Sequence, residues 1–243
     1  MSNLIDLHLT PLSSESQAFA YENAQKRFQI LCQAFPKASL RRVKGDGNCF
    51  LRAFIFSYLE GAIKSKDSPS LFAQIHQTLF VDGVAMLQAT GFQPLVYEDF
   101  MQPVQELLND SASLTVEKLL LFFNDLSTSN SIVIFFRFLT SAFIRARQAY
   151  YENFINWDEF RTFEEFCNAV ESLDKESDHL SIVALNEFLG GVCCIFLLDN
   201  TPISENTQQI KLLFQSESPV LQLQPINLLY RPGHYDLLYP EGE

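Results

Sequence analysis

The chain has 243 residues and a formal net charge of −12 at pH 7, with 47% hydrophobic and 19% charged residues. This length suffices for one domain with a sizeable core, and the composition is that of a globular protein. The acidic balance argues against nucleic-acid binding, which needs a basic surface. It would attract a basic partner, although a simple role in solubility explains the charge as well.

The sequence offers no sign of export, membrane insertion or metal binding. MSNLIDLHLT lacks a basic flank before an apolar stretch, as a signal peptide would require. The longest apolar run, 132–144, is interrupted by Arg137 and is shorter than the roughly 18 residues of a membrane span. Five irregularly spaced cysteines and four scattered histidines predict free thiols rather than a disulfide framework or a zinc site. We expect a cytoplasmic or nuclear protein.

The first part of the chain carries helical patterns. Apolar residues recur at three- and four-residue steps from Ala24 to Phe35, and Pro36 ends this pattern. We expect residues 1–40 to form an N-terminal helical arm of a single domain spanning 1–243. The stretch 50–59 is apolar on nearly every side, which is typical of a buried helix.

Two more helices are expected at Val116–Leu126 and Ile132–Ile155. The second has Arg137, Arg145 and Arg147 on its predicted polar side. A further helix, beginning at Ser177 or Asp178, should end at the glycine pair 190–191.

The last 50 residues change character. Short apolar runs between polar or proline breaks predict strands at Val192–Leu198, Ile210–Phe214, Val220–Leu223, Ile226–Tyr230 and His234–Tyr239. Their spacing favours a β-meander. We therefore predict an α+β fold in which a helical N-terminal part packs on a C-terminal antiparallel β-sheet.

The stretch GDGNCFLRAF, residues 45–54, places Cys49 where a glycine-containing turn becomes a helix. Gly45 and Gly47 let the backbone turn tightly and leave room for a substrate. A helix N-terminus and a nearby imidazole favour the reactive thiolate, and outward-pointing amides of such a turn can receive an oxyanion. The alternative is that Cys49 is a small core residue beside a simple turn.

A cysteine nucleophile needs a base, and four histidines are available: His8, His76, His179 and His234. The first three lie in an unpatterned tail, on an amphipathic helix and at a helix start, where surface or packing roles are favoured. In RPGHYDLLYP, by contrast, His234 and Asp236 are two residues apart on a predicted strand and share a face. A carboxylate so placed can orient the imidazole, as the third member of a cysteine–histidine–acid triad does.

These two stretches resemble the cysteine box and the histidine box of the ovarian-tumour (OTU) family of deubiquitinating enzymes. Two more segments resemble the otubain branch of that family: FLTSAFIRARQAYYENFI at 138–155 and KESDHLSIVAL at 175–185. The four segments occur in the family's order, between Gly45 and Pro240, so the resemblance covers most of the chain.

The resemblance implies a papain-like fold and a thiol isopeptidase that acts on ubiquitin chains and conjugates without a metal or organic cofactor. Cys49 would be the nucleophile, His234 the general base and later the acid, and Asp236 the group that orients His234. Asp46 matches the aspartate that helps shape the oxyanion loop in the family.

The implied oxyanion contacts are the backbone amides of Gly47, Asn48 and Cys49. The chain departs from the family at Leu51, where the box usually carries a tyrosine; we expect a packing role there. Glu176 and Asp178 would either border the cleft as a gate or cap the following helix.

The implied partners are ubiquitin, polyubiquitin chains and ubiquitin-conjugating enzymes, with no nucleic acid or membrane partner, and a monomer suffices. One alternative is a non-catalytic regulator that binds ubiquitin or a ubiquitin-conjugating enzyme on the same fold. Another is a thiol hydrolase for a different ubiquitin-like modifier, or a general papain-like protease.

Overall fold

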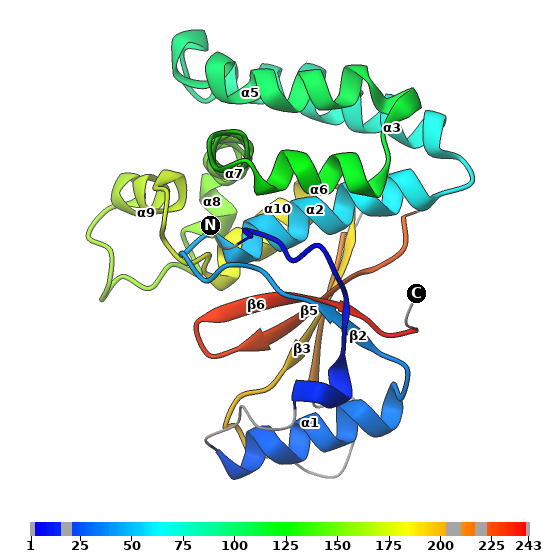
Figure 1. Cartoon of the computed structure of the whole chain (residues 1–243). Helices are drawn as coiled ribbons and strands as arrows, with labels where there is room; N and C mark the ends of the chain where they lie inside the picture. Colours follow the sequence, from blue (N-terminus) through cyan, green and yellow to red (C-terminus); the bar gives the residue numbers. More distant parts are fainter. Residues whose placement is uncertain (1–2, 16–20, 203–209, 217–222, 242–243) are drawn as a thin grey trace.

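The computed structural model describes residues 3–15, 21–202, 210–216 and 223–241. A sheet runs through the middle of the molecule, most of the helices lie on one of its faces, and α1 (Glu22–Ala34) covers the other (Figure 1). The helices of the larger layer are α2 Cys49–Lys64, α3 Ser68–His76, α4 Gly83–Ala89, α5 Pro94–Asn109, α6 Val116–Asn124, α7 Leu126–Ala146, α8 Gln148–Tyr151, α9 Phe163–Glu171 and α10 His179–Phe188. Short turns of other helix types lie at η1 Leu12–Glu15, η2 Gln77–Asp82 and η3 Ser111–Ser113.

The sheet has six strands in the order β1-β2-β6-β5-β3-β4. Their bounds are β1 Thr10–Pro11, β2 Ser39–Arg41, β3 Val192–Leu197, β4 Lys211–Gln215, β5 Ile226–Arg231 and β6 His234–Tyr239. Neighbouring strands are antiparallel except β3 and β5, which are parallel. The predicted α+β class is confirmed, although β1 and β2 precede most of the helices, and the sheet is mixed.

The predicted antiparallel meander is therefore wrong at one pairing. β4 ends beside the start of β3, where Gln215 pairs with Val192, and β5 starts at that same end, where Ile226 pairs with Cys193. A strand that starts beside the start of its neighbour must run parallel to it. Of the strand predicted at Val220–Leu223, residues 220–222 lie outside the described residues, and Leu223 lies outside any strand.

Residues 1–40, predicted as a helical arm, are built into the sheet instead. The described part of this segment contains one α-helix, α1, and the strands β1 and β2 extend the sheet beyond β6. Phe28 and Leu31 of α1 are buried against Leu229 and other side chains of the sheet. The helix is held there because burying such apolar side chains stabilises each by about 1.5–3 kcal/mol.

Alternation along β3 explains why both faces of the sheet are covered. Cys193 and Ile195 pack into the core beneath α2 and α7, whereas Cys194 and Phe196 pack into the core beneath α1. Successive side chains of a strand point to opposite faces, and here both sets are apolar. The sheet thus holds β6 rigidly against α2, and these two elements carry the candidate site.

The predicted helix 132–155 is shorter at its end than expected. α7 ends at Ala146, because Arg147 leaves the helical region with φ −124° and ψ 33°, and α8 follows. By length and composition α7 is the one described helix that could span a membrane, yet 67% of its most apolar window is buried inside the protein. It packs against α5, α9 and α10 as a central core helix.

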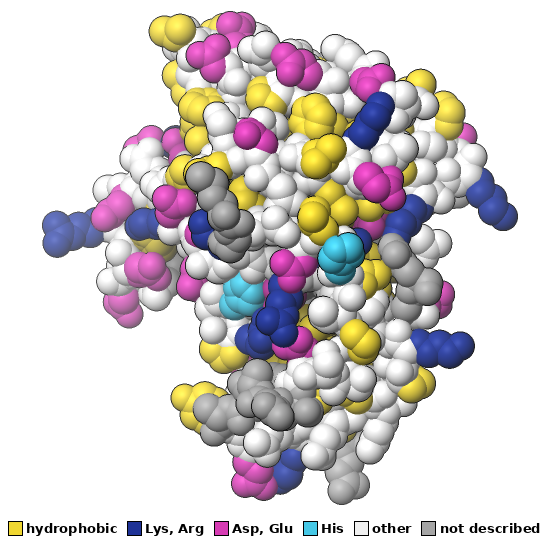
Figure 2. Space-filling model, viewed as in Figure 1, with side chains coloured by type: hydrophobic (Ala, Val, Ile, Leu, Met, Phe, Trp, Pro, Cys, Tyr) yellow, Lys and Arg dark blue, Asp and Glu magenta, His cyan; other side chains and the backbone are white. Residues whose placement is uncertain are grey.

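Charged side chains are spread over the molecule. On the face shown in Figure 2 the acidic side chains are scattered rather than gathered in one patch. This scattered distribution fits a role of the acidic residues in solubility.

Candidate active site

Cys49 is the first residue of α2, as its place after the glycine-containing turn predicts. The side chain is 3% exposed and its thiol is free. The turn approaches the histidine of β6 closely: a Cβ atom on Gly45 would lie 3.2 Å from Nδ1 of His234. A residue larger than glycine would therefore press on the imidazole.

His234 and Asp236 lie two residues apart on β6, and Nε2 of His234 is 2.9 Å from Oδ1 of Asp236. The Asp236 side chain is fully buried, while that of His234 is 21% exposed. Asp236 also accepts a hydrogen bond from the backbone N–H of Val43 at 2.8 Å and forms an ion pair with Arg231. Two donors besides the imidazole hold the carboxylate, which in turn holds the imidazole.

The thiol of Cys49 lies within hydrogen-bonding reach of the His234 ring. Hydrogen bonds to Asp236 and then to Cys49 raise the pKa of His234 to about 9, against the opposing effect of burial. For Asp236, burial acts to raise the pKa. The hydrogen bonds from His234 and the Val43 amide, together with the charges of His234 and Arg231, outweigh burial, and the pKa of Asp236 is lowered. At neutral pH the site thus holds an imidazolium between a carboxylate and a sulfur atom.

The turn before Cys49 is braced by Asp46. Its Oδ1 accepts hydrogen bonds from the backbone N–H of Asn48 at 3.1 Å and from Nη1 of Arg52 at 2.8 Å. Arg52 is fully buried in α2 and also donates to Ser129 at 3.0 Å. The amide of Asn48 is therefore engaged inside the turn, which corrects the expectation that it faces an oxyanion.

Of the four histidines, the structure brings His234 to Cys49. His179 lies at the start of α10 with its ring against Phe214, and His76 of α3 packs its ring against Phe80. The ring contact of His179 fits the capping or packing role predicted for it, and His76 is exposed, which fits its predicted surface role.

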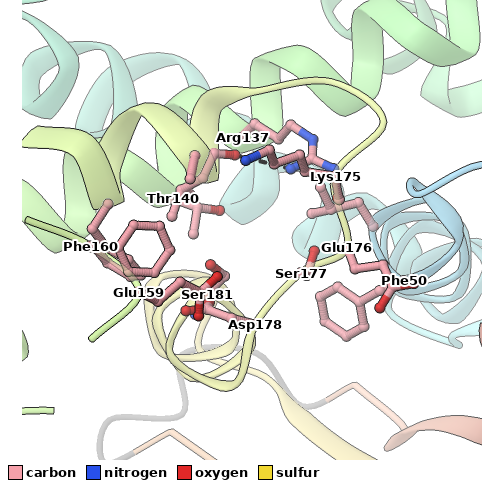
Figure 3. A pocket seen from close by; sticks show the side chains of 14 residues that line it. Phe50, Arg137, Thr140, Glu159, Phe160, Lys175, Glu176, Ser177, Asp178 and Ser181 are labelled. Carbon is pink, nitrogen blue, oxygen red and sulfur yellow. Dashed lines mark hydrogen bonds between the residues drawn. The ribbon is translucent and has the colours of Figure 1, made fainter. Parts of the chain in front are cut away.

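A pocket opens beside the first turn of α2. It is lined by aromatic side chains, among them Phe50, Phe160 and Phe166, and by charged or polar ones from α7 and the loop before α10. Figure 3 shows Glu159, Asp178 and Ser181 together on one side, with Arg137 and Lys175 on the other. Asp178 lines this pocket and caps α10, accepting from the Ser181 amide at 2.7 Å, so the predicted cap is confirmed and the predicted gate stays a prediction.

Sequence reasoning missed three arginines that support the site. Arg137, expected on a polar helix face, is 2% exposed and donates to Asn48 Oδ1 at 3.0 Å. Arg231 contacts Asp236, and Arg52 contacts Asp46. The sequence did contain a signal for Arg137, because this residue interrupts a long apolar run. A cation buried with such a run needs polar partners inside the protein.

Known proteins with similar sequences and folds point to one family. The chain matches the family model for peptidase C65, otubain, over residues 6–240. It is 34% identical to the ovarian tumor domain-containing deubiquitinating enzyme 1 of Arabidopsis thaliana over 83% of this chain and 70% of that protein. It is 35% identical to human ubiquitin thioesterase OTUB2 over 88% of this chain and 86% of that protein.

A solved complex, h/ceOTUB1-ubiquitin aldehyde-UBC13~Ub, contains a similar chain. The two superpose with a TM-score of 0.82 and 28% sequence identity, over 99% of this chain and 91% of that one. The shared fold thus extends over the helical layer and the sheet alike. With the family model covering nearly the whole sequence, this protein belongs to the otubain family, peptidase C65.

Proposed function

We propose that this protein hydrolyses the isopeptide bond at the C-terminus of ubiquitin through a triad of Cys49, His234 and Asp236. As an otubain with relatives named ubiquitin thioesterase and deubiquitinating enzyme, the chain is a cysteine-type deubiquitinase. The observation that carries the triad is the placement of one imidazole between the Cys49 thiol and the Asp236 carboxylate.

In the first half of the reaction, the sulfur of Cys49 attacks the terminal carbonyl carbon of ubiquitin. The π electrons move to oxygen, and a tetrahedral intermediate forms. His234 gives its proton to the leaving lysine amine, the C–N bond breaks, and a thioester joins ubiquitin to Cys49.

In the second half, His234 takes a proton from water, and the resulting hydroxide adds to the thioester carbonyl. The C–S bond then breaks, which releases the ubiquitin carboxylate and restores the Cys49–His234 pair. Asp236 keeps the imidazole in one orientation throughout and stabilises its charged form.

The oxyanion of both intermediates would be received by backbone amides of the turn. The amides of Gly47 and Cys49 are the proposed contacts, since that of Asn48 donates to Asp46. Donors preorganised for a developing negative charge are worth about 10²–10³ in rate each. Asp46 and Arg52 hold the turn in shape for this purpose.

The pocket of Figure 3 suits an extended peptide with apolar and polar groups, because aromatic rings, carboxylates and the cations of Arg137 and Lys175 line it together. We propose that the tail of ubiquitin approaches Cys49 along this side.

A second function is favoured by the structural neighbours, which are complexes with ubiquitin aldehyde and with UBC13~Ub or UBCH5B~Ub. Ubiquitin and ubiquitin-conjugating enzymes are accordingly the proposed partners of this chain. Binding such an enzyme could block ubiquitin transfer without any cleavage. A Cys49→Ala variant that still inhibits transfer would reveal this role.

The deciding experiment is a time course with each diubiquitin linkage, comparing the wild type with Cys49→Ala on a gel. Cleavage of some linkages by the wild type alone supports the proposed hydrolase and gives its linkage preference. Cleavage of none favours the binding role, whereas cleavage by both proteins removes Cys49 from the mechanism. Probes of other ubiquitin-like modifiers test the substrate class.

A further inference from the structure

The loop between α9 and α10 lies directly on the turn that precedes Cys49. A Cβ atom on Gly47 would fall 2.2 Å from the carbonyl oxygen of Asp174, so the two backbones touch where glycine leaves space. Gly47 also has φ +80°, which glycine adopts freely. The loop therefore fits against the turn and constrains it.

Asn48 and Asp174 bond to each other twice across this contact. Asn48 Nδ2 donates to Asp174 Oδ1 at 2.7 Å, and the backbone N–H of Asp174 donates to Asn48 Oδ1 at 3.1 Å. Asn48 is 1% exposed, whereas Asp174 lies at the surface. This Asn48–Asp174 pair joins residues 126 positions apart.

Asn48 does not cap its helix with its side chain and makes these hydrogen bonds instead. It is the N-cap residue of α2, and asparagine at that position usually accepts a hydrogen bond from the helix. Here its side chain makes no cap bond and turns to Asp174 and Arg137 instead. The side chain thus serves the turn and the loop rather than the helix.

Asp174 has φ +62°, the one positive value among the described residues other than glycine. A residue in that conformation costs of order 1–3 kcal/mol unless its surroundings impose it, and such residues cluster at active sites. The two hydrogen bonds to Asn48 supply that constraint. Asparagine, aspartate and glycine tolerate the conformation best.

Arg137 fixes the same groups from beneath. Its Nη2 donates to Asn48 Oδ1 at 3.0 Å and to the Gly47 carbonyl at 3.4 Å, while Nη1 donates to the Val170 carbonyl at 3.0 Å. Burial lowers the pKa of Arg137 to about 10, and the nearby charge of Asp174 opposes that shift. The guanidinium therefore links the turn to the end of α9.

We infer that Asp174 is a positioning residue for the reaction: through Asn48 it holds the turn whose amides receive the oxyanion. The inference rests on the proposed hydrolase function and adds to it a residue far from the cysteine and histidine boxes. Asp174 touches neither Cys49 nor His234 in this account and acts by fixing Asn48.

Two substitutions separate the side chain from the backbone. Asp174→Gly keeps the positive φ without strain and removes the carboxylate, whereas Asp174→Asn keeps the conformation and an oxygen that can accept from Asn48. We expect kcat for diubiquitin cleavage to fall by about tenfold in Asp174→Gly, less than the loss of an oxyanion donor itself, and to stay within about threefold of the wild type in Asp174→Asn. Ser172→Gly, which loosens the same loop without touching Asn48, is the matched control and should leave kcat unchanged.

A second readout distinguishes positioning from general damage. Alkylation of Cys49 by iodoacetamide displaces iodide from a CH2 group and builds no oxyanion, so its rate should be equal in the wild type and Asp174→Gly. A drop in both rates, or a large fall in melting temperature, would mean that Asp174 merely supports the fold, and the inference fails.

A double-mutant cycle tests the route through Asn48. In an Asn48→Ala background, Asp174→Gly should have no further effect on kcat, because the partner is gone. Additive losses would overturn the inference. A wild type that cleaves no ubiquitin substrate would refute the proposed function itself, whereas a wild type that cleaves and an equally active Asp174→Gly would refute the inference alone.

Discussion

Oδ1 of Asp236 lies 2.9 Å from Nε2 of His234. The other ring nitrogen, Nδ1, borders Gly45 and is therefore left for the side of the ring that faces Cys49. The carboxylate is fully buried, yet it is paired, since Arg231 and the Val43 amide also donate to it. A buried anion with three donors stays ionised and does not move. The orientation of the imidazole is therefore built into β6 and its neighbours.

Replacing the nucleophile should separate binding from chemistry. Cys49→Ala removes the sulfur but no part of the surrounding pocket, so hydrolysis should disappear while ubiquitin affinity changes by less than about twofold. Calorimetric titration with monoubiquitin measures the affinity, and gel assays measure cleavage. A variant that still cleaves would exclude Cys49 as the nucleophile.

The histidine should matter more than its orienting aspartate. His234→Ala removes the acid and base, whose contribution is typically about 10²–10⁴ in rate. Asp236→Asn retains an oxygen that can accept from His234 and so should cost less, roughly tenfold to a hundredfold, through the lost charge. Steady-state kinetics on diubiquitin compares the two, and equal losses would mean that the charge, not the orientation, is decisive.

The pH dependence should follow His234. Because its pKa is raised to about 9, kcat/KM for a lysine-linked substrate should fall above about pH 9, where the imidazolium that protonates the leaving amine is lost. In Asp236→Asn the hydrogen bond to His234 is weaker and the negative charge is lost, so this alkaline limb should move down toward the ordinary value of 6.5. An unchanged limb would assign it to another group.

The stability of the fold should depend on pH through His234 and Asp236, and the two contributions should change in opposite directions with pH. A raised pKa of His234 stabilises the fold fully below about pH 6.5, and this contribution is lost as the pH rises through about 9. The lowered pKa of Asp236 stabilises the fold above about pH 3.8 and is lost as the pH falls through its folded value. Melting curves of the wild type and His234→Ala, recorded from pH 4 to 10, should converge at the alkaline end, and parallel curves would contradict the assignment.

Arg231 should act on the triad from outside it. Arg231→Ala would leave the buried Asp236 without one of its two cationic partners, which should raise the pKa of that carboxyl and destabilise the fold by about 1–3 kcal/mol. Activity should fall because His234 is held less firmly. Arg231→Lys, which keeps the charge but not the planar fork, is the matched control and should recover part of both losses. Chemical denaturation and kinetics on the same samples provide the check.

The residues of the proposed triad could be located in the sequence because their signals are local. A glycine-containing turn before an apolar helix marks Cys49, and a two-residue spacing on a strand places His234 and Asp236 on one face. The same local logic predicted the start of α2 and a cap of α10 at Ser177 or Asp178, and the structure has it at Asp178. Each of these predictions depends on residues that lie close together in the sequence.

What the sequence by itself determined, then, is which chemistry the chain carries: a thiol at a helix start, and an imidazole with its carboxylate on a strand. The tertiary structure decided what surrounds that chemistry. The parallel pairing of β3 with β5, the burial of Arg137 and the pair of Asn48 with Asp174 all join residues more than 25 positions apart. Such contacts depend on which end of the sheet a strand enters and which loop crosses which turn. Local propensity does not encode these choices, because they are settled only when the whole core packs.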